Sequence, residues 1–145
     1  MADYGKAIEL NPTYSLAYRN RGSAYLPRGK LELAIADLDR SIELDPGNST
    51  AYISRGVIRA ASGNLTLAVD GYTLAIMVDP TSLNAYLNQG SAYGRLGRYA
   101  EAVIDYGNAL HLAPDSPTLY TNRWASFHAQ DDLQRPSPTS KSGLP

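Results

Sequence analysis

The residues with the clearest binding chemistry recur at one spacing. Asn20, Ser54, Asn88 and Asn122 follow one another at intervals of 34 positions. An Asn side chain carries both a hydrogen-bond donor and an acceptor, so a row of them could bind the backbone of an extended peptide without reading its sequence. The alternative is that Asn at these positions only tolerates a helix surface that faces water. The sequence leaves both interpretations open.

Residue types that serve catalysis and metal binding are scarce. The chain has no cysteine, which excludes disulfide scaffolds, thiolate metal sites and cysteine nucleophiles. His111 and His128 are too few for a histidine metal cluster, and each falls near the end of a predicted helix, where the helix dipole favours a basic side chain. We expect no enzymatic activity, no cofactor and no bound metal.

The charge balance argues against nucleic acid and membrane partners. The 145 residues, about one domain in length, carry 13 Lys and Arg against 14 Asp and Glu, a net charge of −1. A chain so close to neutral has no overall field to hold nucleic acid or an anionic membrane surface. No apolar run approaches the roughly 18 residues of a transmembrane helix, and the start lacks the pattern of a signal peptide. The lack of cysteine fits a cytoplasmic location, which we expect.

Many other residues recur at the same 34-residue period, which identifies a tandem repeat. The matching positions are Pro12, Pro46, Pro80 and Pro114; Tyr18, Tyr52, Tyr86 and Tyr120; Gly22, Gly56 and Gly90; Gly29, Gly63 and Gly97; and Ala34, Ala68 and Ala102. Apolar residues within each unit recur at helical spacing, so each unit is predicted to be a pair of helices. We expect first helices over 15–26, 49–61 and 83–95 and second helices over 31–44, 65–78 and 99–112. Further helices are expected over 2–10 and 117–130.

Single residues in the first unit predict local features that the other units repeat in part. Gly29 lies where a residue in the left-handed backbone conformation would end the first helix. Gly22 lies in the middle of that helix, at a cost of ~1 kcal/mol relative to alanine, which suggests a close approach of the paired helix. Ser15 and Ser49 are candidates for helix N-caps. Pro27 is expected to end its helix early.

The order of these residues resembles the tetratricopeptide repeat, a 34-residue helix-turn-helix unit, at Tyr18, Gly22, Tyr25, Gly29, Ala34 and Pro46. The resemblance covers residues 1–130. It implies an all-α fold, an α-solenoid of stacked antiparallel helix pairs that follows the arc of a right-handed superhelix. It also implies a non-catalytic scaffold for protein interactions, although the same scaffold serves many partners and names none of them.

In the frame of this repeat, we expect a half repeat at 1–14, full repeats at 15–48, 49–82 and 83–116, a terminal helix at 117–130 and a disordered Pro/Ser-rich tail at 131–145. A chain that begins halfway through a repeat is either a fragment of a longer array or exposes on its first helix a face that a partner covers. Near the other end, Trp124 stands where the other units have the mid-helix glycine. We expect Trp124 and Phe127 to cover the open end of the core.

The residue before the mid-helix glycine is usually apolar in this family, but here the register reads Arg21, Arg55, Gln89 and Arg123. An unpaired guanidinium on a core-facing stripe is costly, so each cation should have a partner. A second-helix register that contains Asp37 and Asp105 offers one. The pattern of replacements favours pairing between consecutive units, as Asp3–Arg21, Asp37–Arg55, Gly71–Gln89 and Asp105–Arg123. The alternative is a solvated charge pattern that matches by coincidence.

First helices line the concave surface of a stacked array, where such proteins bind their partners. We expect a protein or extended peptide to contact the helix stripe next to the core stripe. Its residues are Arg19, Asn20, Ser23, Ile53, Ser54, Val57, Asn84, Leu87, Asn88, Ser91, Arg95, Thr121 and Asn122. The register that contains Asn20 and Asn88 resembles the asparagine ladder in the repeats of O-GlcNAc transferase and in nuclear-import solenoids.

Repeats of this family that hold the acidic C-terminus of heat-shock chaperones use Lys, Arg and Asn from three units. Arg19 could stand for the first lysine, but Ser23 and Ser54 occupy asparagine positions. Asn84 and Asn88 stand where Lys and Arg are needed, so we expect no binding of chaperone tails. Two alternatives to a groove-binding scaffold remain open: a self-assembling module, joined as a homo-oligomer through the N-terminal half repeat, and the substrate-recognition fragment of a larger enzyme.

Overall fold

All regular secondary structure in residues 1–135 is helical, as the sequence predicts. The computed structural model describes these residues, and the predicted tail from residue 136 onward lies outside them. The helices are α1 (Ala2–Leu10), α2 (Ser15–Tyr25), η1 (Leu26–Arg28), α3 (Leu31–Leu44), α4 (Ser49–Ala61), α5 (Leu65–Val78), α6 (Leu83–Arg95), α7 (Tyr99–Leu112) and α8 (Pro117–Gln134). The η1 segment is a single 3₁₀ turn at Pro27, which ends α2 early as expected.

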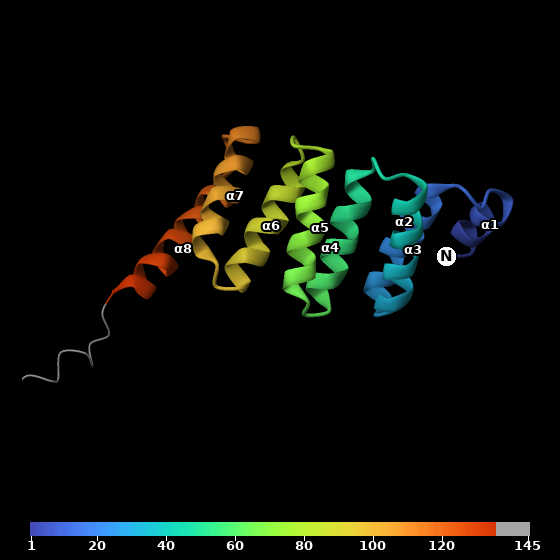
Figure 1. Ribbon diagram of the computed structural model, residues 1–145, viewed down its shortest axis with the longest axis horizontal. Helices are drawn as coiled ribbons and strands as arrows, with labels where there is room; N and C mark the ends of the chain where they lie inside the picture. The colour runs from blue at the N-terminus through green and yellow to red at the C-terminus, as the bar shows by residue number, and fades with distance from the viewer. Residues whose placement is uncertain (136–145) are drawn as a thin grey trace, which may run out of the picture.

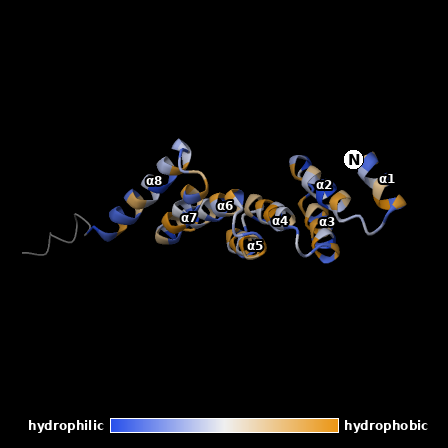
Figure 2. Ribbon diagram, turned by 90° about the horizontal axis from the view of Figure 1, so that it is seen from above, coloured by the Kyte–Doolittle hydropathy of each residue, from blue (hydrophilic) through white to orange (hydrophobic). Residues whose placement is uncertain are grey.

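The helices form an elongated stack in which each element touches its neighbours in the chain. Figure 1 shows α1 and the end of α8 at opposite ends of the array, with the three hairpins α2–α3, α4–α5 and α6–α7 between them. The first helices of consecutive hairpins also touch, α2 with α4 and α4 with α6. Figure 2 shows these first helices on one side of the array and α3 and α5 on the other. This arrangement is an α-solenoid.

Glycine ends the first half of each hairpin. Gly29, Gly63 and Gly97 have φ angles of 70°, 87° and 76°, in the left-handed region that favours glycine because it has no Cβ. Their amides close the turn after η1, α4 and α6. The predicted turn positions are therefore confirmed.

The mid-helix glycines allow the two helices of a hairpin to approach closely. A Cβ placed on Gly56 of α4 would come within 2.5 Å of the Tyr72 ring on α5, and one on Gly22 would come within 2.9 Å of the Leu38 side chain on α3. The glycines thus leave the room that the opposite side chain fills, and the predicted close approach is confirmed.

The two predicted N-cap serines have a different role. Ser15 and Ser49 are the first residues inside α2 and α4, and neither is the capping residue. The Ser15 hydroxyl donates to the Ser41 carbonyl of α3 at 2.9 Å, and the Ser49 hydroxyl donates to the Ala75 carbonyl of α5 at 3.3 Å. The prediction was wrong because these hydroxyls face the paired helix, where a buried carbonyl accepts from them.

Apolar side chains form three separate clusters along the stack. Leu38 of α3 shares a cluster with Ile58 of α4, and Tyr72 of α5 shares one with Ala92 of α6. The third cluster joins α7 to Leu119 of α8 in the same way. Each cluster therefore contains the second helix of one unit and the first helix of the next, so no hairpin completes its core alone.

The last helix differs from the expectation in two respects. It continues to Gln134, beyond the predicted end at residue 130, because no Pro or Gly interrupts it before Pro136. Trp124 and Phe127 are 63% and 52% exposed, so they do not cover the core. Leu119 and Ser126 are the residues of α8 that are buried, whereas the Trp124 ring lies 4.2 Å from that of His128 on the same helix.

The close helix approach makes a prediction for two glycines in helix interiors. Gly56→Ala should destabilise the protein by about 1–3 kcal/mol, because the new methyl group meets the Tyr72 ring. Gly107→Ala is the matched control, since a Cβ there has nothing within 4 Å and alanine favours a helix by up to about 1 kcal/mol. Urea unfolding measures both changes. Equal effects of the two substitutions would contradict the packing role of Gly56.

Candidate functional site

Two adjoining cavities lie on the side of the array where the first helices meet. The cavity between α2 and α4 has a volume of about 230 Å³, and the cavity between α4 and α6 has a volume of about 260 Å³. Val57 of α4 lines both cavities. The two cavities follow one another across three consecutive first helices, and we call them together the groove.

The cavity between α2 and α4 is the more apolar of the two. Leu26, Ile53, Val57 and Ile58 supply its walls, and two serines complete the lining, Ser23 of α2 and Ser54 of α4. The cavity suits an apolar side chain, because burial of such a group against aliphatic walls is favourable and the serine hydroxyls can satisfy an adjacent peptide group.

The cavity between α4 and α6 combines a small-residue wall with several hydrogen-bonding groups. Val57, Ala60 and Ala61 form one wall, and α6 contributes Asn88, Ser91, Ala92 and Arg95. Tyr72 of α5 also lines it. Burial raises the pKa of Tyr72 to about 12, although Arg95 acts in the opposite direction, so the phenol keeps its proton near neutral pH.

Seven of the predicted contact residues line the groove. They are Ser23, Ile53, Ser54, Val57, Asn88, Ser91 and Arg95. The six others lie outside the two cavities, and two of these have an internal role. Leu87 packs against the third apolar cluster, and the Thr121 hydroxyl donates to the Pro117 carbonyl within α8 at 3.0 Å.

The members of the asparagine register differ in their surroundings. The Asn20 side-chain oxygen accepts a hydrogen bond from Arg19 at 3.2 Å. Asn88 lines the groove with its side chain half-buried, and the structure of residues 1–135 shows no internal hydrogen bond of its amide. Asn122 is half-buried on α8 and lines neither cavity. Asn88 is therefore the member of this register best placed to bind a ligand.

Tyr72 and three alanines also line this site, although sequence reasoning did not assign them to it. Tyr72 belongs to the buried stripe of a second helix and is only 2% exposed, yet its ring reaches between α4 and α6. Ala60, Ala61 and Ala92 are small residues that leave the cavity open. A signal for Tyr72 is present in its pairing with Gly56, since a large side chain opposite a glycine can extend past the helix.

The predicted ladder of ion pairs between consecutive units is wrong in its partners. Arg21 forms a bidentate ion pair with Asp37 of its own hairpin. Its Nε and Nη2 atoms donate to Oδ2 and Oδ1 at 2.7 and 2.8 Å. Arg55 instead donates to Asp39, at 2.6 Å. Two residues along an α-helix correspond to a rotation of about 200°, so Asp37 faces the first helix of its own hairpin and Asp39 faces that of the next.

A polar link between consecutive units does exist, through the register of Asp39 and not that of Asp37. Arg55 of α4 bonds back to Asp39 of α3. One unit later, Gln89 of α6 bonds back to Thr73 of α5 at 2.6 Å and to the Val69 carbonyl at 3.3 Å. Gln89 stands at the register of Arg55, and Thr73 stands at the register of Asp39, so both partners of the contact change together from one unit to the next. We call this contact the junction link.

Asp105 has no partner among residues 1–135, although it was expected to pair with Arg123. It is 7% exposed, and its Oδ2 atom is buried without a hydrogen bond. In the first unit, Asp37 at the same register has Arg21, but in the third unit Gln89 turns to α5 instead. Burial raises the pKa of Asp105 to about 7, and the nearby Glu101 carboxylate acts in the same direction.

The described residues show neither a metal cluster nor a membrane helix. In residues 1–135, no three His, Asp or Glu side chains gather in a way that could hold a metal ion. No helix in that part of the chain has the length and apolar character needed to span a bilayer. What the groove offers is apolar contact, amide and hydroxyl hydrogen bonds, and one guanidinium from Arg95.

Comparisons with known proteins agree with this architecture. Two models of the tetratricopeptide repeat match the chain, one over residues 4–36 and the other over residues 83–116. No curated protein matches by sequence. Among solved structures, the Arabidopsis OM64 TPR domain is 27% identical with a TM-score of 0.72, and the match covers 77% of this chain and 93% of that one.

Two further similar structures contain bound peptides. The second TPR domain of human RPAP3, in complex with the HSP70 peptide SGPTIEEVD, is 26% identical with a TM-score of 0.72, covering 77% of this chain and 93% of that chain. The first TPR of Spaghetti (RPAP3), bound to the HSP90 peptide SRMEEVD, is 23% identical with a TM-score of 0.77, covering 81% and 93%.

The buried carboxyl of Asp105 predicts a pH-dependent stability. Its folded-state pKa of about 7 lies above its ordinary value of 3.8, so the folded state binds the extra proton between these limits. The free energy of unfolding should therefore fall as the pH rises from 5 to 8, by at least about 1 kcal/mol. Asp105→Asn should remove this fall and be more stable than the wild type at pH 8. Urea unfolding at both pH values tests this, and an equal pH dependence in the two proteins would contradict it.

Proposed function

The chain is a tetratricopeptide-repeat protein, and on that premise we propose that it is a non-catalytic scaffold that binds an extended peptide segment of a partner protein in the groove. The observation that carries the proposal is the pair of cavities that share Val57 as a common wall. They follow one another along three consecutive first helices, as the side chains of an extended segment would require.

The chemistry of the groove supports a peptide as the ligand. The apolar cavity between α2 and α4 accepts one side chain, and the mixed cavity between α4 and α6 accepts a neighbouring polar one. In the cavity between α4 and α6, the Asn88 amide can donate to a peptide carbonyl and accept from a peptide N–H. The Tyr72 phenol stays protonated and can also donate. Such a site recognises an extended backbone and a small number of side chains.

Similar structures support peptide binding in this fold, but the residues here favour a different class of peptide. The RPAP3 domains described above hold HSP70 and HSP90 peptides that end in EEVD. In this chain, Asn84 and Asn88 occupy the positions where such clamps need Lys and Arg. Neutral amides gain little from a terminal carboxylate, so we propose a partner that is not a chaperone tail.

Substitution of Asn88 tests the groove as the binding site. Peptides selected from a random twelve-residue display library against the full chain provide the ligand. Asn88→Ala should weaken their binding at least fivefold in calorimetric titration, because backbone hydrogen bonds are lost, and should leave the thermal midpoint nearly unchanged.

The matched control for this substitution is Met77→Ala. Met77 is 72% exposed on α5, outside the groove, so its truncation should change neither peptide affinity nor stability. If Asn88→Ala binds the peptides as tightly as the wild type, or loses stability and not affinity, Asn88 is structural and the groove assignment fails.

A further inference from the structure

The junction link is incomplete at the last junction of the array. At the two central junctions, a side chain of the first helix bonds back to the preceding second helix, Arg55 to Asp39 and Gln89 to Thr73. At the junction between α7 and α8, the residues of the same registers are Arg123 and Gly107. The arginine is present, and the position that should supply its acceptor has no side chain.

Arg123 has no acidic partner within the described part of the chain. No carboxylate of residues 1–135 lies within ion-pair distance of its guanidinium, which lies 5.5 Å from the centre of the Tyr120 ring. Residues 136–145 contain neither Asp nor Glu. The first junction also has a glycine, Gly5, but there Arg21 pairs with Asp37 of its own hairpin. Arg21 and Arg55 of this register each pair with an aspartate, whereas Arg123 pairs with no carboxylate among the described residues.

An open cavity occupies the place of the missing acceptor. It has a volume of about 390 Å³ and is lined by Gly107, Leu110, His111, Pro114, Tyr120 and Arg123. A Cβ placed on Gly107 would have nothing within 4 Å among the described residues, so no atom of residues 1–135 fills the space where Asp39 would have its counterpart. The His111 Nδ1 lies 2.8 Å from the Gly107 carbonyl, which holds the imidazole at the cavity wall.

We infer that this cavity binds the carboxylate of a Glu or Asp side chain from a partner protein, which takes beside Arg123 the place that Asp39 takes beside Arg55. The guanidinium offers a planar pair of donors that matches a carboxylate. Leu110, Pro114 and Tyr120 provide apolar walls for an aliphatic residue next to the acid. Phosphopeptide sites use clusters of arginines, whereas this cavity contains one.

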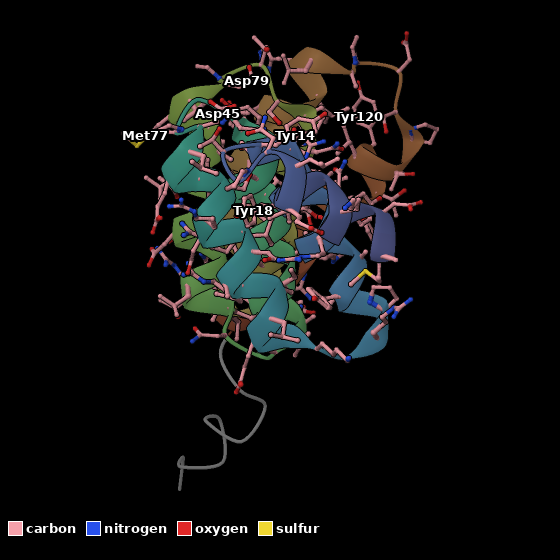
Figure 3. The ribbon with its side chains drawn as sticks, turned by 90° about the vertical axis from the view of Figure 1, so that its right-hand side faces the viewer. Tyr14, Tyr18, Asp45, Met77, Asp79 and Tyr120 are labelled. Carbon is pink, nitrogen blue, oxygen red and sulfur yellow. The ribbon has the colours of Figure 1, made fainter. Side chains whose placement is uncertain are left out.

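The site is separate from the groove and goes beyond the function proposed for it. Neither groove cavity includes a residue of α7 or α8. Figure 3 shows Tyr120 at the upper edge of the array, the edge at which Asp45 and Asp79 follow α3 and α5. Pro114, in the connection between α7 and α8, places the cavity at this edge as well. A partner could therefore contact both surfaces or only one.

Nuclear magnetic resonance of the full chain, observed at the arginine Nε–H groups, tests the inference directly. The probe is the peptide acetyl-Leu-Glu-Leu-amide, with acetyl-Leu-Gln-Leu-amide and inorganic phosphate as comparisons. We expect the Glu peptide to shift the Arg123 signal to saturation with a Kd on the order of 1 mM, and the Gln peptide to leave it unshifted. The groove substitution Asn88→Ala should not change this titration, which separates the Arg123 site from the groove.

Two substitutions of one glycine provide the matched variants. Gly107→Asp places a carboxylate beside Arg123 from within the chain, so it should weaken binding of the Glu peptide at least tenfold and raise the thermal midpoint above that of Gly107→Asn. Gly107→Asn adds a side chain of equal size without the charge, so it should weaken binding less than Gly107→Asp does. Binding of the Glu peptide to Gly107→Asp as tightly as to the wild type would overturn the inference. So would equal shifts with the Gln peptide, or saturation by phosphate alone.

Discussion

The contact that orders this array is the junction link, a hydrogen bond from the core-facing side of a first helix back to the preceding second helix. Arg55 is mostly buried, and a guanidinium in that position needs an acceptor. Asp39 supplies it from the neighbouring unit. The next junction replaces both partners together, with Gln89 and Thr73. Because apolar clusters alone tolerate sliding between helices, a directional bond at each of the two central junctions fixes how far one hairpin is displaced and turned relative to the next.

The groove follows from that fixed relation between neighbours. Consecutive first helices touch, and the residues that line each cavity come from two adjacent units. Contacts of this kind join hairpins that are next to each other in the chain. The geometry of each successive junction therefore determines the shape of the binding surface. The junction between α7 and α8 shows the converse. Where Gly107 replaces the acceptor, the space stays open and Arg123 is left with an aromatic ring as its neighbour.

The repeat period predicts most of the fold, because Gly29, Gly63 and Gly97 mark the turns and the mid-helix glycines mark the close contacts. The registers of Ser23, Ile53 and Val57 likewise predict much of the groove lining. The sequence does not reveal which first helix each carboxylate of α3 contacts. Asp37 and Asp39 lie about 200° apart around α3, and only the packing of α2 and α4 against it decides that Asp37 faces α2 and Asp39 faces α4. Tyr72 belongs to the buried stripe of α5, and only the geometry shows that it also lines the groove. Trp124 has the volume of a capping residue, but it projects from the side of α8 opposite the buried Leu119 and Ser126.

A double-mutant cycle on Asp39 and Arg55 tests the ordering role of the junction link most directly. The free energy of unfolding is measured by urea for the wild type, Asp39→Ala, Arg55→Ala and the double variant, with the exposed pair Arg40 and Glu43 as a control cycle. We predict a coupling energy of at least about 1 kcal/mol across the junction and no more than about 0.5 kcal/mol in the control. Additive effects of the two junction substitutions would show that apolar packing alone holds the units in register.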